Sequence, residues 1–340
     1  MTRIGIGHSF IEFQHQHSIP IPDSMLQFEE KKMNRLVLNR ALSTTKSNHD
    51  ILQKYSFPRA QHGLQSVNAA TIKVSLTPTG VATVTLNRPQ KLNSFNMEMW
   101  EDLYNVFNCI KHDEKVKVVV LNGSNNNFST GMDLEVFAEM NKLSSSAKCE
   151  GRKREGLENL IQFFQDCISA PEIICPVPVI AAINGYCIGG AVDLIAACDM
   201  RYCTTSSTFS IKETDLAMVA DIGTLQRLPK LIGDSQTREL AYTSRLFNGT
   251  EAEKIGLALK AFSTEEELIS HVNKVAETIA IKSPLTIRGI KKTLLYSRDH
   301  TVKDSLYQVN LHNTAYLYNA DLMEATKAHF MKSKPSFTLP

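Results

Sequence analysis

The segment CPVPVIAAINGYCIGGAVDLIAAC (175–198) is the only long apolar run in the sequence, and it decides the class of fold. Its length would allow it to span a bilayer, but two prolines, an asparagine, three glycines and an aspartate interrupt it. The pattern instead predicts a buried strand over 177–183, a tight glycine turn, and a buried helix over 188–198. A fully apolar strand that leads directly into a buried helix is typical of α/β folds.

Outside this segment, predicted strands and helices alternate. Two β-rich runs, 71–77 and 81–87, flank a Pro-Thr-Gly turn and predict a hairpin. A strand over 115–122 is continuously apolar in its second half, so we expect it near the centre of a sheet. The remaining predicted elements are helices over 93–111, from 132 and over 155–169, strands over 200–203 and 208–211, and helices almost throughout from about 235. This order predicts an α/β core followed by a C-terminal helical region.

The composition is that of an ordinary globular protein. Of 340 residues, 43% are hydrophobic, and 37 basic residues against 35 acidic ones give a net charge of +2. This balance supplies no overall basic field, so a general affinity for nucleic acid is not expected. The seven cysteines are odd in number, lack any C-x-x-C spacing and do not adjoin a histidine. We therefore expect buried free thiols in a reducing compartment, and neither a disulfide framework nor a zinc site.

Residues 1–70 differ from the rest and predict a disordered extension. Within them, 33–60 carries recurring arginines and leucines with no acidic residue until Asp50, which is typical of a mitochondrial presequence. The alternative is a surface extension with no targeting role. The C-terminal Thr-Leu-Pro differs from the peroxisomal Ser-Lys-Leu signal, so the mitochondrial matrix is the expected location rather than the peroxisome.

Two similar turns, at 129–134 and 188–194, each place a glycine immediately before a predicted helix. Glycine permits a tight turn and a close approach to a ligand, and a helix start presents unpaired N–H groups. Two such N–H groups that converge on one oxygen would form an oxyanion hole, in which each donor is worth about 3 kcal/mol. The alternative is that both are ordinary glycine turns. The G-x-S-x-G, P-loop and H-E-x-x-H motifs are absent from the sequence.

Three acidic residues, Asp193, Glu213 and Asp221, lie in or near apolar surroundings. Carboxylates in such places are uncommon unless they are paired or functional, and burial raises their pKa values into the range useful for acid–base catalysis. The alternative roles are helix capping and ion pairing with one of the nearby cations, Arg201, Lys212 or Arg227.

From about residue 71 to 335, the sequence resembles the enoyl-CoA hydratase/isomerase (crotonase) superfamily. The resemblance is carried by Asn87-Arg88-Pro89, Lys91-Leu92-Asn93-Ser94, Phe128-Ser129-Thr130-Gly131-Met132-Asp133-Leu134, Pro178-Val179-Ile180-Ala181-Ala182-Ile183-Asn184-Gly185 and Gly189-Gly190-Ala191. It implies a spiral of ββα units over 71–270 and a helical region over 271–340 that forms a homotrimer or homohexamer. It also implies an acyl-CoA thioester ligand, with no metal and no redox cofactor.

The resemblance further implies which residues bind the thioester. The backbone N–H groups of Met132 and Gly190 would be the oxyanion donors. Ser129, Thr130, Gly131 and Gly189 would line the substrate site. Departures from the family pattern are Thr130 in place of alanine, Val177 in place of lysine and Ala191 in place of glycine.

The acidic residues resemble those of the dienoyl-CoA isomerase branch of this superfamily, together with the flanking runs 212–215 and 220–229. This implies conversion of 3,5-dienoyl-CoA to 2,4-dienoyl-CoA in the β-oxidation of unsaturated fatty acids. In that reaction Glu213 would remove the C2 proton, Asp221 would protonate C6, and Asp193 would orient and tune Glu213.

Three other functions remain open. An enoyl-CoA hydratase would need two acids beside one water, and Asp193 is one methylene shorter than the glutamate of that pattern. A non-catalytic acyl-CoA-binding paralogue would not need all three acids. An RNA-binding member of the family would be expected to carry a lysine-rich helix, which the sequence lacks.

The presequence hypothesis can be tested on the native protein. If 33–60 directs import with Met33 as the working start, mass spectrometry of the mature N-terminus will place it downstream of Met33. A native N-terminus that retains Met1 would contradict the hypothesis.

Overall fold

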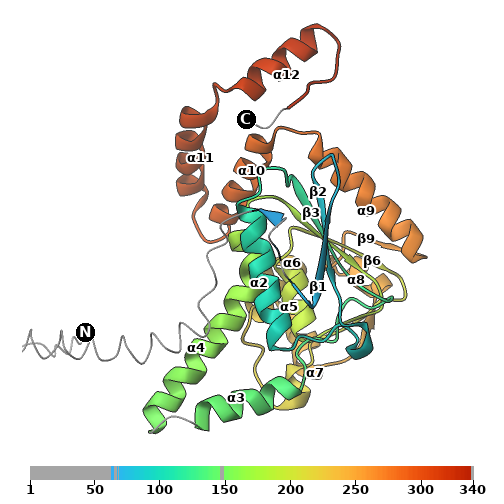
Figure 1. The fold of residues 1–340 in the computed structure, drawn as a ribbon, viewed down its shortest axis with the longest axis vertical. Coiled ribbons are helices and arrows are strands. Elements are labelled where there is room, and N and C mark those ends of the chain that lie inside the picture. Colours follow the sequence, from blue (N-terminus) through green and yellow to red (C-terminus); the bar gives the residue numbers. More distant parts are fainter. Residues whose placement is uncertain (1–62, 65–66, 68, 146–148, 338–340) are drawn as a thin grey trace, which may run out of the picture. The chain divides into compact units, whose positions relative to one another are not determined.

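The computed structural model describes residues 63–64, 67, 69–145 and 149–337 (Figure 1). The predicted presequence at 33–60 lies outside these ranges, as does nearly all of the predicted extension over 1–70. Within the described ranges, the helices are α2 (Met97–Lys111), α3 (Glu135–Ser145), α4 (Glu150–Ser169), α5 (Gly190–Ala196), α6 (Thr224–Ile232), α7 (Asp234–Thr243), α8 (Gly249–Lys254), α9 (Glu265–Ala280), α10 (Pro284–Ser297), α11 (Val302–Tyr316) and α12 (Ala320–Phe330). Three short helical turns are η2 (Pro89–Lys91), η3 (Ala170–Ile174) and η4 (Glu213–Leu216).

A six-stranded sheet forms the framework, in the order β1-β2-β3-β4-β6-β9. Its strands are β1 (Ile72–Leu76), β2 (Val81–Leu86), β3 (Val118–Gly123), β4 (Val179–Ile183), β6 (Met200–Thr204) and β9 (Lys260–Phe262). Strands β1 and β2 are antiparallel, which confirms the predicted hairpin, and the other neighbours are parallel. Parallel neighbours need crossover connections, and helices supply them here. The predicted α/β class is therefore confirmed.

The central strands of the sheet are buried on both faces. Strands β3 and β4 carry the runs VVVL and VIAAI, and all of these residues are buried. Side chains alternate between faces along a strand, so neighbouring residues pack on opposite sides. Val120 and Ile180 belong to the core cluster that α9 completes with Leu268 and Val272 (Figure 1). The predicted boundary at residue 270 falls inside α9, and the division into 71–270 and 271–340 stays a prediction.

Helices α2 and α4 pack together through an aromatic cluster. Trp100 on α2 is fully buried, and its ring centroid lies 4.9 Å from that of Phe164 on α4. The Phe95 ring, which precedes α2, contacts Trp100 edge-on at the same centroid distance. Buried aromatic pairs of this kind add about 1 kcal/mol beyond the area that they bury. They fix α2, and with it the loop that leads from β2 towards the site.

A second, smaller sheet brings two distant loops together. It contains β5 (Tyr186–Ile188), β7 (Thr208–Ser210) and β8 (Phe247–Asn248), in the order β5-β7-β8. An isolated bridge joins Ser129 to Cys187 in β5, and another joins Phe95 to Met132. The two predicted glycine turns are therefore held side by side by backbone pairing.

The C-terminal helices are anchored to the core by a buried lysine. Lys291 on α10 is 5% exposed, and its Nζ donates to Pro171 O (2.7 Å), Val177 O (2.9 Å) and Asp199 Oδ2 (2.8 Å). Such a buried ammonium is tolerated because each of its three donors has an acceptor. Helix α10 is thus attached to the segment that precedes β4.

Among the helices that the structure describes, none combines the length and the apolar character that a membrane span requires.

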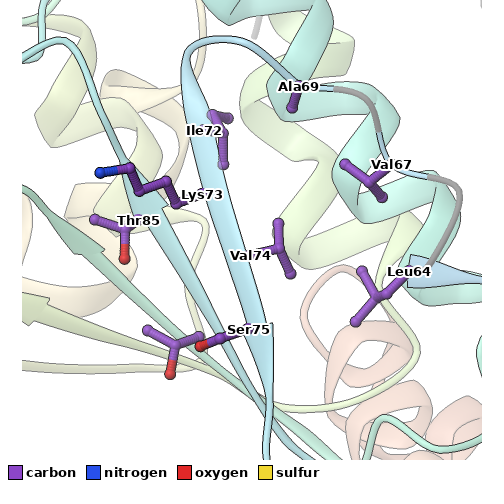
Figure 2. Close-up of a pocket in the computed structure, with 9 residues that line it drawn as sticks. Leu64, Val67, Ala69, Ile72, Lys73, Val74, Ser75 and Thr85 are labelled. Atoms are coloured by element: carbon purple, nitrogen blue, oxygen red, sulfur yellow. The ribbon is translucent and has the colours of Figure 1, made fainter.

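A pocket of about 610 Å³ lies against β1, away from both glycine turns. Figure 2 shows Leu64, Val67 and Ala69 on one side of it and Ile72 and Val74 of β1 on the other. None of the predicted site residues lines this pocket.

Candidate active site

The two glycine turns approach each other so closely that side chains are excluded between them. Gly131 and Gly189 have left-handed φ angles of 77° and 55°. A β-carbon at Gly131 would overlap the carbonyl oxygen of Ile188 and lie 2.9 Å from Gly190 N. A β-carbon at Gly190 would lie 3.8 Å from Met132 N. The backbone amides of Met132 and Gly190 are therefore close neighbours, although they are 58 positions apart in the sequence.

These two amides are free to bind a ligand. Phe95 N donates to Gly131 O (2.8 Å), and Asp133 N donates to Phe95 O (3.0 Å). Because consecutive amides in an extended segment point to opposite sides, the intervening Met132 N–H points away from Phe95. Gly190 is the first residue of α5, where an N–H has no partner within the helix. Neither amide donates a hydrogen bond to any residue in the described ranges. The pair has the character of an oxyanion hole.

A buried asparagine supports the first of these turns. Asn93 is 0% exposed and has a left-handed φ of 56°. Its side chain accepts from Arg88 N (2.9 Å) and donates to the carbonyl oxygens of Ser124 (2.9 Å) and Asn127 (2.8 Å). Ser129 Oγ donates to Asn93 O (2.7 Å) and accepts from Gly131 N (3.0 Å). The network fixes the backbone on which Met132 depends.

This network also shows where the predicted substrate-binding residues lie. The Ser129 side chain is fully buried and its hydroxyl is bonded to backbone atoms, so it supports the turn from behind. Thr130 is half-buried, and its N–H donates to Leu92 O (3.2 Å). Gly131 and Gly189 supply the close backbone approach described above. All four residues belong to the paired turns.

Asp193 lies in the first turn of α5 and is completely buried. Its Oδ1 accepts a 2.5 Å hydrogen bond from the N–H of Thr224, the first residue of α6, whereas its Oδ2 has no partner in the described ranges. Burial, followed by the negative charge of Glu213, raises the pKa of Asp193 to about 7. A carboxyl group with this pKa changes its protonation state near neutral pH.

Glu213 begins η4 and lies beside the second glycine turn. A β-carbon at Gly189 would lie 3.4 Å from Glu213 Oε1, so this carboxylate adjoins the residue that precedes the Gly190 amide. Its Oε2 is buried and has no partner in the described part of the chain. Burial, with a further contribution from the charge of Asp221, raises the pKa of Glu213. A partly desolvated, unpaired carboxylate of this kind is suited to act as a general base.

Asp221 lies in the loop that precedes α6. Its neighbour Ile222 is buried, and Cδ1 of that side chain would lie 3.6 Å from a β-carbon at Gly190. The Asp221 side chain is exposed at its end, but partial burial raises its pKa. The structure thus places Glu213 beside Gly189 and the loop of Asp221 beside Gly190, while Asp193 is buried in the first turn of the helix that Gly190 begins.

The cations that could have paired with these acids are bound elsewhere. In the described ranges, Arg227 pairs with Glu172, Lys212 with Asp215, and the Arg201 guanidinium donates to the carbonyl oxygens of Leu257, Ile195 and Cys198. The capping alternative holds for one oxygen only, since Asp193 Oδ1 caps the start of α6. The three acids therefore remain without a direct ion pair among the described residues.

Sequence reasoning missed the residues that hold this arrangement. Gln165 on α4 donates from Nε2 to the carbonyl oxygen of Asp221 (2.7 Å), and Asn93 organises the first turn. Asn93 belongs to a motif that carries the family resemblance, but its structural role has no signal in a single sequence. Gln165 lies on a helix 56 residues away from its partner, and nothing in its local sequence marks it.

The cysteines and the potential metal ligands form no further site in this region. All seven cysteines are free, and only Cys149 is exposed. Burial raises the pKa of Cys175 to about 11, so that thiol stays protonated at neutral pH. Within the described ranges, no group of three or more His, Cys, Asp or Glu side chains is placed to hold a metal ion.

Comparison with known proteins agrees with this geometry. Residues 77–339 match the family model described as enoyl-CoA hydratase/isomerase. A peroxisomal Delta(3,5)-Delta(2,4)-dienoyl-CoA isomerase of Arabidopsis thaliana is 43% identical over 261 residues, which cover 77% of this chain and 94% of the relative. A mitochondrial protein of the same name from Mus musculus is 38% identical over 276 residues, covering 81% and 84% of the two chains.

Solved structures show the same fold. The crystal structure of an enoyl-CoA hydratase from Bacillus anthracis superposes with a TM-score of 0.70 at 29% sequence identity, covering 78% of this chain and 98% of the other. The sequence-based expectation of a crotonase fold is confirmed. The chain is a member of the enoyl-CoA hydratase/isomerase family.

Proposed function

We propose that this protein isomerises 3,5-dienoyl-CoA to 2,4-dienoyl-CoA in the β-oxidation of unsaturated fatty acids. The observation that carries the proposal is the position of Asp221, whose neighbour Ile222 packs against Gly190 and whose charge adds to burial in raising the pKa of Glu213. A shift of two double bonds needs a base near C2 and an acid near C6, and Glu213 and Asp221 are the pair proposed for these two roles. The names of the relatives from Arabidopsis thaliana and Mus musculus support the same substrate class.

In the proposed reaction the thioester oxygen lies between the N–H groups of Met132 and Gly190. Glu213 removes a proton from C2, and the electron pair of that C–H bond delocalises through the diene onto the thioester oxygen. The two amides stabilise this oxyanion, each by about 3 kcal/mol. Asp221 then donates a proton to C6. One C–H bond breaks and one forms, with no addition of water and no change of oxidation state, so the reaction requires neither a metal nor a redox cofactor.

Asp193 is proposed to tune the base. The charge of Glu213 raises the affinity of the buried Asp193 carboxyl group for a proton, because two negative charges in a poorly solvated region repel. After each turnover Glu213 carries the C2 proton and Asp221 has lost one, so the enzyme returns to its starting state by proton exchange with solvent. The three acids titrate as a coupled set.

An enoyl-CoA hydratase is the second candidate function, supported by the hydratase from Bacillus anthracis among the solved structures. Hydration needs two acids beside one water, and Asp193 uses one oxygen to cap α6. The proposed isomerisation gives Asp221 a role, whereas hydration leaves it without one. A non-catalytic acyl-CoA-binding protein would have no need of the raised pKa values at Asp193, Glu213 and Asp221.

We further propose that α10–α12 assemble the protein into a homotrimer or homohexamer. These helices expose large apolar side chains, among them Val302 (78%), Leu306 (63%), Tyr318 (91%) and Phe330 (79%). Apolar surface of this extent is typical of a protein–protein interface.

A location in the mitochondrial matrix is proposed from the basic stretch at 33–60 and from the name of the mouse relative, although the Arabidopsis relative is peroxisomal.

Replacement of either proposed proton-transfer group should abolish isomerisation without weakening the binding of acyl-CoA. We expect Glu213→Gln and Asp221→Asn each to lower kcat by roughly 100-fold or more, since general acid–base groups typically contribute 10²–10⁴-fold. The dissociation constant for an acyl-CoA ester should change little, because the backbone amides remain. Ultraviolet absorbance with 3,5-dienoyl-CoA measures turnover, and 2-enoyl-CoA measures hydration in parallel.

Asp215→Asn is the matched control for these variants. Asp215 belongs to the same short helix as Glu213, but it is half-exposed and paired with Lys212. It should retain wild-type turnover. Full isomerase activity in Asp221→Asn would refute the proposed reaction, and hydration of 2-enoyl-CoA as the main activity would favour the second candidate.

The raised pKa of Asp193 predicts a pH-dependent effect on stability. The folded protein holds this proton with a pKa of about 7, against an ordinary value of 3.8, so its free energy of unfolding falls as the pH rises between these values. Asparagine cannot ionise, yet its oxygen can still accept the Thr224 N–H. Asp193→Asn should therefore stabilise the fold by roughly 1–3 kcal/mol more at pH 8 than at pH 5 in urea titrations. An equal change at both pH values would contradict the raised pKa.

The assembly surface can be tested by measuring mass in solution. Light scattering coupled to size exclusion should give three or six chains for the wild type. Leu306→Asp places a charge in the exposed apolar face of α11 and should lower the mass. Leu259→Asp changes a comparably exposed leucine (58%) outside α10–α12 and should not. A monomeric wild type would contradict the proposal.

A further inference from the structure

A buried carboxylate outside the proposed active site binds two arginines at once. Glu172 in η3 is 5% exposed. Its Oε2 accepts from Arg227 Nε (2.9 Å) and Nη2 (2.7 Å), and its Oε1 pairs with Arg298 Nη1. Arg227 Nη2 also donates to Ser169 Oγ (2.8 Å). Loss of one partner from a buried charge cluster of this kind is costly, so its members hold one another in place.

The two arginines come from different parts of the fold. Arg298 is the C-cap of α10, in the C-terminal helical region, whereas Arg227 lies in the first turn of α6. Lys291 of α10 binds the carbonyl oxygen of Pro171, the residue before Glu172. Lys291 of α10 and its C-cap Arg298 thus bind two consecutive residues of η3, and η3 in turn binds Arg227 of α6 through Glu172.

Helix α6 is connected directly to the proposed acids. The N–H of Thr224, its first residue, donates to Asp193 Oδ1, and Asp221 lies three positions earlier. A β-carbon at Gly223 would overlap Arg227 Nη1, so the guanidinium lies against the turn between Asp221 and α6. Any displacement of Arg227 therefore acts on the backbone that carries Asp221.

We propose that Glu172 is a positioning residue that transmits the placement of α10 through Arg227 to the loop of Asp221 and the Asp193–Thr224 contact. In this way the C-terminal helices, which are proposed to form the assembly, set the geometry of proton transfer. The expected effect on proton transfer rests on the proposed function. The expected effect of Arg298 on the placement of α6 is independent of that function.

The deciding variant is Arg298→Met, because this side chain is 41% exposed and its loss should leave the chain folded. Its matched control is Arg288→Met, since Arg288 lies on the same helix and its side chain, among the residues that the structure describes, bonds to Pro284 O of that helix alone. We expect Arg298→Met to lower kcat by about 3- to 30-fold with KM little changed. Arg298→Lys should restore part of the activity by renewing the ion pair. Glu172→Gln should have a larger effect in the same direction.

Hydrogen exchange of the segment 217–227 gives a readout that does not depend on the reaction. Arg298→Met should accelerate its exchange, whereas Arg288→Met should leave it as in the wild type. If wild-type protein fails to convert 3,5-dienoyl-CoA, the proposed function is refuted. The exchange data then test by themselves whether Arg298 controls the placement of α6 and the Asp221 loop. Wild-type exchange in Arg298→Met overturns the inference. So does a rise in KM with unchanged kcat.

Discussion

The close contact between two glycine turns is the constraint on which the rest of the site depends. A β-carbon at Gly131 would overlap the Ile188 carbonyl oxygen, and Gly189 has a left-handed φ, so glycine at these two positions lets the amides of Met132 and Gly190 lie side by side. Backbone donors cannot be moved by a change of rotamer, so their placement is a property of the fold itself. The smaller sheet, the buried Asn93 and the start of α5 all act to fix this contact. A preorganised pair of donors needs little rearrangement when charge develops on a ligand.

The same contact explains why a carboxyl group can be buried at Asp193. The residue follows Gly190 by one helical turn, and it lies where unpaired N–H groups favour a negative charge. Burial opposes that charge and prevails, as the raised pKa shows. Only the Thr224 N–H binds the carboxyl group directly among the described residues. The balance leaves a carboxyl group that can carry or release a proton near neutral pH, directly beside Glu213.

Local sequence patterns predicted the framework well and the supporting contacts poorly. The apolar run at 175–198, the hairpin and both glycine turns were evident because each is encoded within a short stretch. Strands β8 and β9 lie in a region whose pattern predicted mainly helices; they exist because β7 and β6 offer edges to pair with. The links from Gln165 to Asp221 and from Arg298 through Glu172 to Arg227 join residues 55 or more positions apart. Such contacts depend on tertiary packing, which a single sequence does not encode locally.

The position of Asp193 also bears on the choice between isomerisation and hydration. A second acid that shared one water with Glu213 would need a side chain free to face that water. Asp193 is short, fully buried and bonded through Oδ1 to the start of α6, and its burial and the charge of Glu213 raise its pKa. Asp221 is exposed, and its neighbour Ile222 packs against Gly190. Acids with such different surroundings suit the proposed transfer of a proton between distant carbons better than the activation of one water molecule.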